Sequence, residues 1–381
     1  MLLFHKGERF SCIQLLYLAR RCFLILISPR SNFRMNINKK ILVTGGTGFL
    51  GSYLLRYLVQ KGYNNIFAIR RATSKMDLVE PIEDKIQWVE CDILDVKGLE
   101  KAMVGVEQIY HAAAMVSFEA KHRKRMHQVN IQGTANVVNL ALENNIEKLV
   151  HVSSIAALGR RKRLKEINEK TKWEKSNFNS EYAVSKYLSE QEVWRGMAEG
   201  LRACIINPSI ILGAGFWEEG SASFFSKTNK GNKFYGVGGT GFVDVRDVSR
   251  LMIDMMESEM VGEKVIANGE NVSYRKVFEI IADSINKKRP SIALNSILGA
   301  LAWRAEWLRS KITGSSALVT KETVENSFRT WIYQNQKSID TFNFKYTPIE
   351  QTIQETGALF LETTQKKERS MYLSVNQLVT N

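Results

Sequence analysis

The chain has 381 residues, of which 44% are hydrophobic, enough to bury a full core, and this predicts one large α/β domain with a smaller companion. The formal net charge is +14, but the basic residues are scattered and no recognised nucleic-acid module occurs, which argues against a nucleic-acid partner. The four cysteines lack metal-ligand or disulfide spacing, so we expect free thiols, no metal site and a cytoplasmic location.

Residues 1–34 are basic and partly apolar, and we expect them to form an extension outside the fold. Arg20 and Arg21 interrupt the apolar run from Leu15 to Ile27, and the remainder is far shorter than the ~20 residues that span a bilayer. Met35 lies close to the first expected strand, which suggests a misassigned start. An Arg-rich targeting peptide is the alternative, and no clear membrane span is predicted.

From Lys40 to Ile211, apolar β-type runs alternate with segments of helical periodicity. This alternation predicts a doubly wound parallel sheet with helices on both faces. The expected strands are Lys40–Thr44, Ile66–Arg70, Ile86–Glu90, Gln108–Ala112, Lys148–Val152 and Arg202–Ile206, and the expected helices are Leu50–Gln60, Leu99–Met103, Arg125–Glu143 and Ala183–Glu199.

The later part of the chain is expected to contribute two more strands and a smaller region. Phe242–Val248 and Lys264–Ala267 are interpreted as returns to the sheet. We therefore assign residues 35–211, with the returns at about 242–270, to a dinucleotide-binding domain. Residues 212–241 and 271–365 are assigned to a substrate-side region, and residues 366–381 to a loose polar tail.

The first expected strand leads directly into a glycine-rich turn, and a helix follows it. The turn has the sequence Thr44-Gly45-Gly46-Thr47-Gly48-Phe49-Leu50-Gly51. Gly45 permits the tight turn, Gly48 lets the backbone approach a pyrophosphate, and Gly51 allows the helix to pack closely on the strand. The phosphate charge would lie at the helix N-terminus. This order predicts a Rossmann dinucleotide site, with Thr44, Thr47, Phe49 and Leu50 also beside the cofactor.

The end of the second expected strand predicts which dinucleotide binds. An NAD site would place a carboxylate there for the ribose 2′-hydroxyl, but the chain has Arg70 and Arg71, and no carboxylate occurs between Gly51 and Asp77. A guanidinium matches a 2′-phosphate, so Arg70, aided by Arg71 or Lys75, predicts NADP(H) in preference to NAD.

Three residues are candidates for the chemistry. Tyr182 and Lys186 are four residues apart, so on a helix they share a face, and a neighbouring ammonium favours the phenolate of a group that otherwise titrates near ~10. Ser154 follows the Lys148–Val152 strand and would hold the substrate oxygen by a hydrogen bond. Tyr182 is then a general acid/base.

Residues 38–365 resemble an extended short-chain dehydrogenase/reductase, nearest the dihydroflavonol reductase-like and 3β-hydroxysteroid dehydrogenase-like branch of the NAD-dependent epimerase/dehydratase group. The glycine turn, Ser154, Tyr182 and Lys186 carry the resemblance together with Phe242–Val248. By this resemblance, further residues lie beside the cofactor: Asp92 and Ile93, Ala112 and Ala113 within His111–Ala114, Asn130, Ser153, and Asn207 with Pro208 in a turn over the nicotinamide. Many relatives have Arg where this chain has Asn207. Homodimers are common in that family, but the sequence shows no dimer interface, so the oligomeric state stays open.

The expected reaction is NADPH-dependent reduction of a ketone or aldehyde, or the reverse oxidation, on an apolar small molecule. Lys186 is expected to hold the ribose hydroxyls of the cofactor as well as to tune Tyr182. Trp303, Trp307 and Trp331 would suit apolar pocket walls, although ordinary core packing explains them equally well. Two alternatives stay open, a nucleotide-sugar epimerase or dehydratase with tightly bound NAD and a non-catalytic NADP-binding sensor. A third possibility is membrane-surface attachment through Ile292–Leu308, for which core packing is the commoner explanation.

Overall fold

The computed structural model describes residues 36–161, 166–313, 321–366 and 371–375. The expected extension of residues 1–34 and most of the expected polar tail lie outside the described residues. Both therefore stay predictions, as does the boundary between the dinucleotide-binding domain and the substrate-side region.

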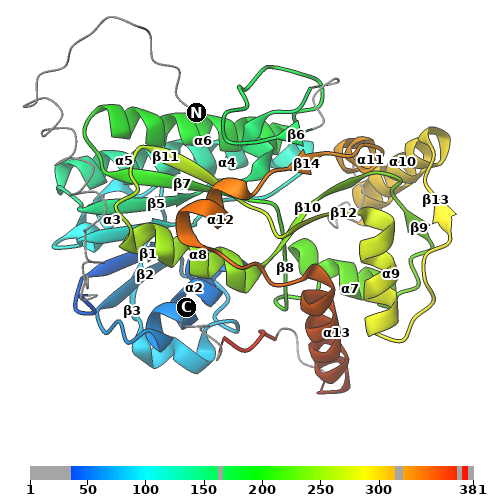
Figure 1. Cartoon of the computed structure of the whole chain (residues 1–381), viewed down its shortest axis with the longest axis horizontal. Coiled ribbons are helices and arrows are strands. Elements are labelled where there is room, and N and C mark those ends of the chain that lie inside the picture. The colour runs from blue at the N-terminus through cyan, green and yellow to red at the C-terminus, as the bar shows by residue number, and fades with distance from the viewer. Residues whose placement is uncertain (1–35, 162–165, 314–320, 367–370, 376–381) are drawn as a thin grey trace, which may run out of the picture. The chain divides into compact units, whose positions relative to one another are not determined.

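A parallel seven-stranded sheet forms the centre, with the strand order β11-β7-β5-β4-β1-β2-β3 (Figure 1). Its strands are β1 (Ile41–Thr44), β2 (Ile66–Arg70), β3 (Gln87–Glu90), β4 (Gln108–His111), β5 (Lys148–Val152), β7 (Ala203–Pro208) and β11 (Glu263–Ala267). All six pairings are parallel, so the carboxyl ends of the strands meet at one edge. The predicted fold class is confirmed.

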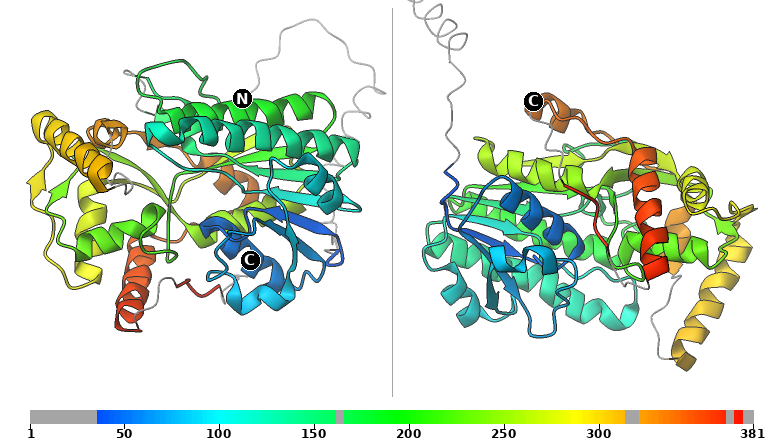
Figure 2. Two further views of the ribbon diagram at one scale, coloured as in Figure 1. Left: turned by 180° about the vertical axis from the view of Figure 1, so that it is seen from behind. Right: turned by 90° about the horizontal axis from the view of Figure 1, so that it is seen from below.

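Helices cover both faces of this sheet, because successive residues of each strand point to opposite sides (Figure 2). On one face, α3 (Val96–Met103), α5 (Gly133–Glu143) and α6 (Glu181–Ala198) pack around Leu149 of β5. On the other, α2 (Phe49–Gln60) and α8 (Val245–Glu257) pack around Val150. The hydrophobic core therefore consists of two layers separated by the sheet.

One expected return to the sheet is wrong. Phe242 lies in β10 (Gly239–Asp244), which pairs with β8 (Ile210–Leu212) and β12 (Glu270–Ser273) in a separate three-stranded sheet. The chain becomes helical at Val245, because the Asp244 carboxylate accepts a hydrogen bond from Arg246 N at 2.7 Å and caps α8. An apolar run predicts burial but not the sheet that a strand joins. The other return, Lys264–Ala267, is confirmed within β11.

The expected helix Arg125–Glu143 is divided into three parts. It begins as α4 (Arg123–His127), passes through a π-helical turn (Gln128–Gln132) and continues as α5. Such single π turns are rare and occur mostly at functional sites, and no sequence periodicity announces this one.

The remaining elements surround the sheet or follow it in the chain. They are the strands β6 (Glu166–Ile167), β9 (Phe234–Tyr235), β13 (Ile292–Ala293) and β14 (Ile332–Tyr333), the helices α7 (Ser223–Asn229), α9 (Tyr274–Ser284), α10 (Ser296–Thr313), α11 (Lys321–Ser327), α12 (Gln336–Phe342) and α13 (Ile349–Lys366), and the short 3₁₀ helices η1 (Glu80–Lys85), η2 (Ala120–His122), η4 (Ile155–Leu158) and η5 (Gly220–Ala222). Of the helices in the described ranges, none is both long and apolar enough to cross a membrane.

Candidate active site

The glycine turn between β1 and α2 requires glycine at two positions. Gly45 has a φ of +74°, and a Cβ added there would lie 2.7 Å from the backbone nitrogen of Ala113. A Cβ added at Gly51 would lie 2.1 Å from the carbonyl oxygen of Gly45. The first glycine thus lets the turn reach the end of β4, and the third lets α2 start directly against the turn.

The N-terminus of α2 fits an anionic ligand. Gly48 is its N-cap, no side chain caps the helix, and its first turn contains no acidic residue. The first backbone hydrogen bond of this helix runs from Ser52 N to Gly48 O at 2.9 Å. The N–H groups of Phe49, Leu50 and Gly51 come before it, at the open end of the helix. These groups would hold the pyrophosphate of a dinucleotide, with the helix dipole favouring its charge. Gly48 is exposed, and Thr47 is half-buried beside it.

Thr44 has a different part in the structure from the other residues of the turn. Its hydroxyl accepts from Ala113 N at 3.1 Å and lies 2.7 Å from Nδ1 of His111. The side chain is fully buried, so it joins the ends of β1 and β4 beneath the turn. Ala112 and Ala113 follow β4 and are half-buried.

The residues expected around the adenosine half of the cofactor lie at the ends of β2 and β3. Arg70 is half-buried, and within the described part of the chain its guanidinium has no partner, whereas Arg71 is exposed. Lys75 forms an ion pair with Glu219 at 2.5 Å instead. Asp92 accepts from Leu94 N at 2.9 Å and from Arg125 at 3.2 Å. The next residue along the chain, Ile93, is buried in the core.

Asn130 lies in the π-helical turn and connects two parts of the site. Its amide exchanges hydrogen bonds with Met115, accepting from the backbone nitrogen at 2.7 Å and donating to the carbonyl oxygen at 3.0 Å. It also donates to Ser185 Oγ at 2.9 Å. Asn130 therefore holds the chain after β4 against α6 next to Lys186, and these contacts are internal to the protein.

Ser154 and Tyr182 meet at the carboxyl edge of the sheet. Ser154 follows β5 and caps η4, with its hydroxyl accepting from Ala156 N at 3.1 Å. Burial raises the pKa of Tyr182 to about 12, and the nearby side chain of Ser154 opposes this shift. The phenol is therefore protonated at neutral pH, and the ring of Phe118 lies edge-on to it at 5.8 Å.

Lys186 is buried one turn further along α6. Its ammonium donates to the carbonyl oxygen of Val152 at 2.8 Å, and we find no direct hydrogen bond to Tyr182 among the described residues. Burial lowers the pKa of Lys186 to about 8, while the charge of Glu190 opposes this shift. The preceding serine pair differs in environment: Ser153 is buried, and its hydroxyl has no partner in the part of the chain that the structure describes.

Sequence reasoning missed Glu190 and misplaced Asn207. Glu190 is 1% exposed, and Asn207 donates from one amide nitrogen to its carboxylate at 2.5 Å and to the carbonyl oxygen of Ser154 at 2.9 Å. Asn207 and Pro208 belong to β7, so the expected turn starts only after them. The four-residue spacing from Lys186 is the one signal that could have identified Glu190.

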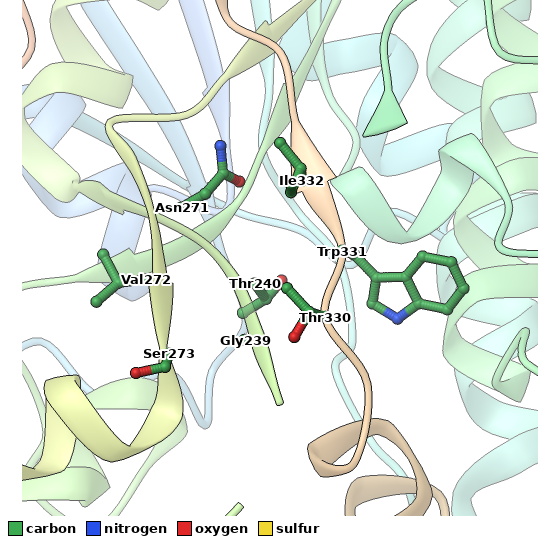
Figure 3. A pocket seen from close by; sticks show the side chains of 8 residues that line it. All are labelled: Gly239, Thr240, Asn271, Val272, Ser273, Thr330, Trp331 and Ile332. Carbon is green, nitrogen blue, oxygen red and sulfur yellow. The ribbon is translucent and has the colours of Figure 1, made fainter. Parts of the chain in front are cut away.

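A cavity of about 200 Å³ lies between β10, β12 and the segment that leads into β14. Figure 3 shows Asn271 and Ile332 on one side of that segment and the indole of Trp331 projecting from the other. Of the tryptophans expected as pocket walls, Trp331 is buried and Trp303 is half-buried on α10, while the side chain of Trp307 lies outside the described residues. Membrane attachment through Ile292–Leu308 stays untested.

Known proteins resemble this chain over most of its length. The model of the NAD dependent epimerase/dehydratase family matches residues 41–268. A putative dihydroflavonol 4-reductase from Synechocystis is 27% identical over 322 residues, 82% of this chain and 91% of that protein. Sterol demethylase protein B from Methylococcus capsulatus is 28% identical over 264 residues, 66% of this chain and 76% of that protein.

Solved structures agree on the fold. The crystal structure of gox2253 has a TM-score of 0.72 at 28% identity, covering 87% of this chain and all of that one. The dTDP-glucose 4,6-dehydratase DesIV from Streptomyces venezuelae, solved with NAD, has a TM-score of 0.70 at 20% identity over 86% of this chain and 98% of that chain, which shows the fold alone. The predicted resemblance is confirmed, and the protein is an NAD(P)-dependent enzyme that acts on CH–OH or C=O groups. This chain belongs to the NAD dependent epimerase/dehydratase family.

Proposed function

We propose that this enzyme is an NADP(H)-dependent reductase that converts a ketone or aldehyde on a small, largely apolar molecule into the alcohol, or catalyses the reverse oxidation. The pair of Ser154, which follows β5, and Tyr182, in the first turn of α6, carries the proposal. The pair lies at the carboxyl edge of a parallel sheet, where ligands of such folds bind, and the glycine turn opens at the same edge. The similarity to a putative dihydroflavonol 4-reductase supports a reductase.

The three candidate side chains have separable roles in this reaction. The bound nicotinamide would supply the hydride. Ser154 holds the substrate oxygen, and Tyr182, which burial keeps protonated at neutral pH, donates the proton that the oxygen needs. Lys186 brings a positive charge beneath the site and stabilises the phenolate left behind.

NADP(H) is proposed over NAD because of Arg70. Its guanidinium is half-buried at the carboxyl end of β2 and is not engaged by another described residue. A planar cation in that position suits a 2′-phosphate, and the sequence between Gly51 and Asp77 has no carboxylate to accept from a 2′-hydroxyl. The other proposed cofactor contacts are those of the glycine turn, Asp92, Ala112 and Asn207. Homodimerisation and a cytoplasmic location also remain proposals.

The decisive experiment compares the wild-type enzyme with Tyr182→Phe. We expect both proteins to bind NADPH with equal affinity. With a panel of apolar aldehydes and ketones, the wild type should oxidise NADPH at least ~10²-fold faster than Tyr182→Phe. Ser189→Ala, on the same helix, is the matched control, because the buried Ser189 hydroxyl donates to the carbonyl oxygen of Lys186 within that helix. Unchanged turnover by Tyr182→Phe would contradict the proposal. Co-purified NAD with no net redox change would favour the epimerase/dehydratase alternative, and NADP binding without turnover would favour a sensor.

A further inference from the structure

Two arginines near the start of α6 have no acidic partner. Arg160 follows η4, and Arg329 lies between α11 and β14. Both side chains are half-buried, and across the described ranges neither lies within ion-pair distance of a carboxylate. The neighbouring Arg161, by contrast, forms an ion pair with Glu174 at 2.6 Å. The charge of the first two is therefore not neutralised by the described part of the chain.

Neutral groups hold Arg160 in place. Its Nε donates to the hydroxyl of Tyr333 and its Nη1 to Oδ1 of Asn326, both at 3.1 Å. The second terminal nitrogen, Nη2, makes no hydrogen bond to any described residue. These contacts orient the guanidinium and leave one of its edges free for a ligand.

The backbone of Arg160 connects the two segments that carry Ser154 and Tyr182. Arg160 N donates to Oδ1 of Asn179, and Arg160 O accepts from Ser176 Oγ at 2.5 Å. Asn179 directly precedes Ser180, the N-cap of the helix that carries Tyr182. Arg160 is thus attached at one end to the Ser154 segment and at the other to the start of the Tyr182 helix.

An aromatic pair lies between the two cations. The guanidinium of Arg329 lies 3.9 Å from the ring centre of Phe178, and that of Arg160 lies 6.0 Å from Trp331. The two rings are 6.5 Å apart. Trp331 is 4% exposed, yet its Nε1 has no acceptor within the part of the chain described, and it packs in one cluster with Ile155 beside Ser154.

Physical chemistry indicates what completes this arrangement. Partly burying a guanidinium without a counter-ion is unfavourable, and two such cations against one aromatic pair add mutual repulsion. A carboxylate or phosphate would relieve both effects, because the guanidinium fork binds two oxygens of either group. The indole N–H of Trp331 is a further donor without an acceptor, and the rings of Phe178 and Trp331 offer an apolar surface to the body of the same molecule.

We infer that Arg160, Phe178, Asn326, Arg329, Trp331 and Tyr333 form a substrate subsite, the Arg160–Arg329 site, which binds an acidic group of the molecule whose carbonyl reacts at Tyr182. This inference rests on the proposed function and makes it more specific. The substrate class is an aromatic or otherwise apolar aldehyde or ketone that carries a carboxylate or a phosphate away from the reacting carbon.

A matched pair of aldehydes tests the inference. We expect 4-carboxybenzaldehyde to be reduced with a lower KM than its neutral analogue methyl 4-formylbenzoate. Arg160→Met and Arg329→Met should each raise the KM for the acid roughly tenfold or more, with kcat and the KM for the ester changed little. Arg160→Lys should restore part of the loss, and Arg161→Met is the control that leaves both KM values unchanged. Equal effects on acid and ester would overturn the inference.

A binding measurement separates failure of the subsite from failure of the proposed function. With NADP⁺ present, benzoate and inorganic phosphate are titrated separately into the wild type and both Met variants. Binding is followed by tryptophan fluorescence and by the heat released on binding. Saturable binding that both variants weaken supports the subsite even if no aldehyde turns over, and the tighter of the two probes identifies carboxylate or phosphate. Binding of neither probe, or equal binding by all variants, overturns it. Arg329→Met breaks no described hydrogen bond and serves if Arg160→Met does not fold.

Discussion

Arg70 is the single residue on which the proposed cofactor preference depends. It ends β2 opposite Glu90 of β3, and its side chain is half-buried with no described partner. Its neighbours are less suited to this role, since Lys75 is already paired with Glu219. The residue type and its position at the strand end were both predictable, because the strand is short, buried and followed by a polar loop.

Replacing Arg70 by Asp should reverse the cofactor preference. We expect the Kd for NADPH to rise by roughly two orders of magnitude, since a charge-assisted contact is lost and a like charge is introduced. The Kd for NADH should change far less. Fluorescence titration of both cofactors measures this, with Lys101→Asp, at an exposed position on α3, as the control. Equal losses for NADPH and NADH would refute the assignment.

Other residues show the limit of local motifs. Ser154, Tyr182 and Lys186 could be proposed as candidates because each belongs to a short pattern in a fixed chain order. Glu190 could not, because its significance comes from Asn207 on β7 and from the burial of both side chains. Asn207 gives Glu190 a neutral amide partner, and Lys264 lies 3.7 Å from the carboxylate.

Among the elements, β4 and β5 place two histidines side by side beneath the site. His111 and His151 are register partners with ring centres 5.1 Å apart, and both are buried. Burial lowers the pKa of His111 to about 3 and that of His151 well below its ordinary value, with the charge of Lys186 lowering both further. Both rings are therefore neutral in the folded protein near neutral pH.

This histidine pair predicts an acid-labile fold. Below about pH 6.5 the unfolded chain takes up protons that the folded one does not, so the contribution present above that pH is lost as the pH falls toward 3. His151→Leu should reduce the slope of the free energy of unfolding against pH by up to about 1.4 kcal/mol per pH unit. Urea unfolding at pH 7, 6 and 5 measures it, with half-buried His122→Gln as the control. A slope that His151→Leu leaves unchanged would show that another group is responsible.

The π-helical turn is an element that the sequence did not reveal. Residues 125–143 have the apolar spacing of an ordinary helix, and the extra residue of the π turn is needed only because Asn130 must reach both Met115 and Ser185. Those partners lie in other elements. Helical periodicity therefore identified the helix but not the irregularity within it that aims this side chain.

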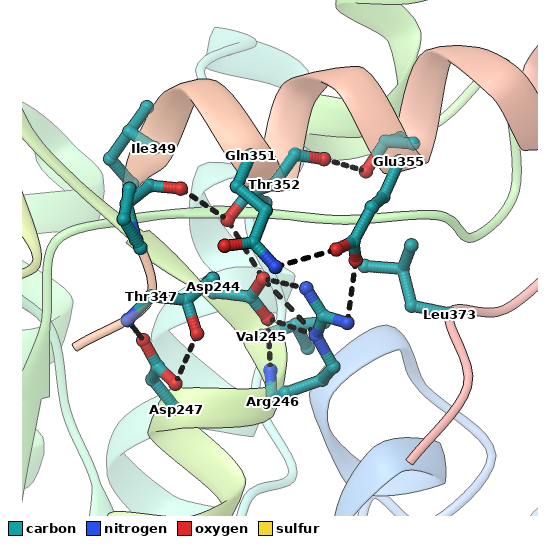
Figure 4. A network of polar contacts seen from close by, with 12 residues as sticks. Asp244, Val245, Arg246, Asp247, Thr347, Ile349, Gln351, Thr352, Glu355 and Leu373 are labelled. Carbon is teal, nitrogen blue, oxygen red and sulfur yellow. Dashed lines mark hydrogen bonds and ion pairs between the residues drawn. The ribbon is translucent and has the colours of Figure 1, made fainter. Parts of the chain in front are cut away.

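At the scale of the whole molecule, a polar network joins the late part of the chain to the start of α8 (Figure 4). Asp244 is fully buried, pairs with Arg246 at 2.7 Å and accepts from Thr352 of α13 at 2.8 Å. Arg246 also pairs with Glu355 at 2.7 Å, and Asp247 accepts from Thr347 N at 2.6 Å. The predicted signature Phe242–Val248 thus anchors α13, a role unconnected with the chemistry.

Removing the buried member of this network should destabilise the molecule more than removing the exposed one. Asp244→Asn removes the buried carboxylate that neutralises the Arg246 guanidinium. This change should lower the free energy of unfolding by about 3 kcal/mol. Glu355→Gln, whose side chain is 37% exposed, should lower it by less than about 1 kcal/mol. Urea denaturation of both variants at pH 7 makes the comparison, and equal losses would contradict it.

The sequence by itself determined the strands and helices of the parallel sheet, the glycine turn and the chain order of Ser154, Tyr182 and Lys186, because periodicity and turn chemistry act over a few neighbouring residues. Only the tertiary structure decided which sheet β10 joins, which residue holds Asn207, and that Arg160 and Arg329 share one aromatic pair. Arg160 and its partner Asn326 are 166 positions apart in the chain. Contacts of that kind depend on how complete elements pack, and no local pattern encodes them.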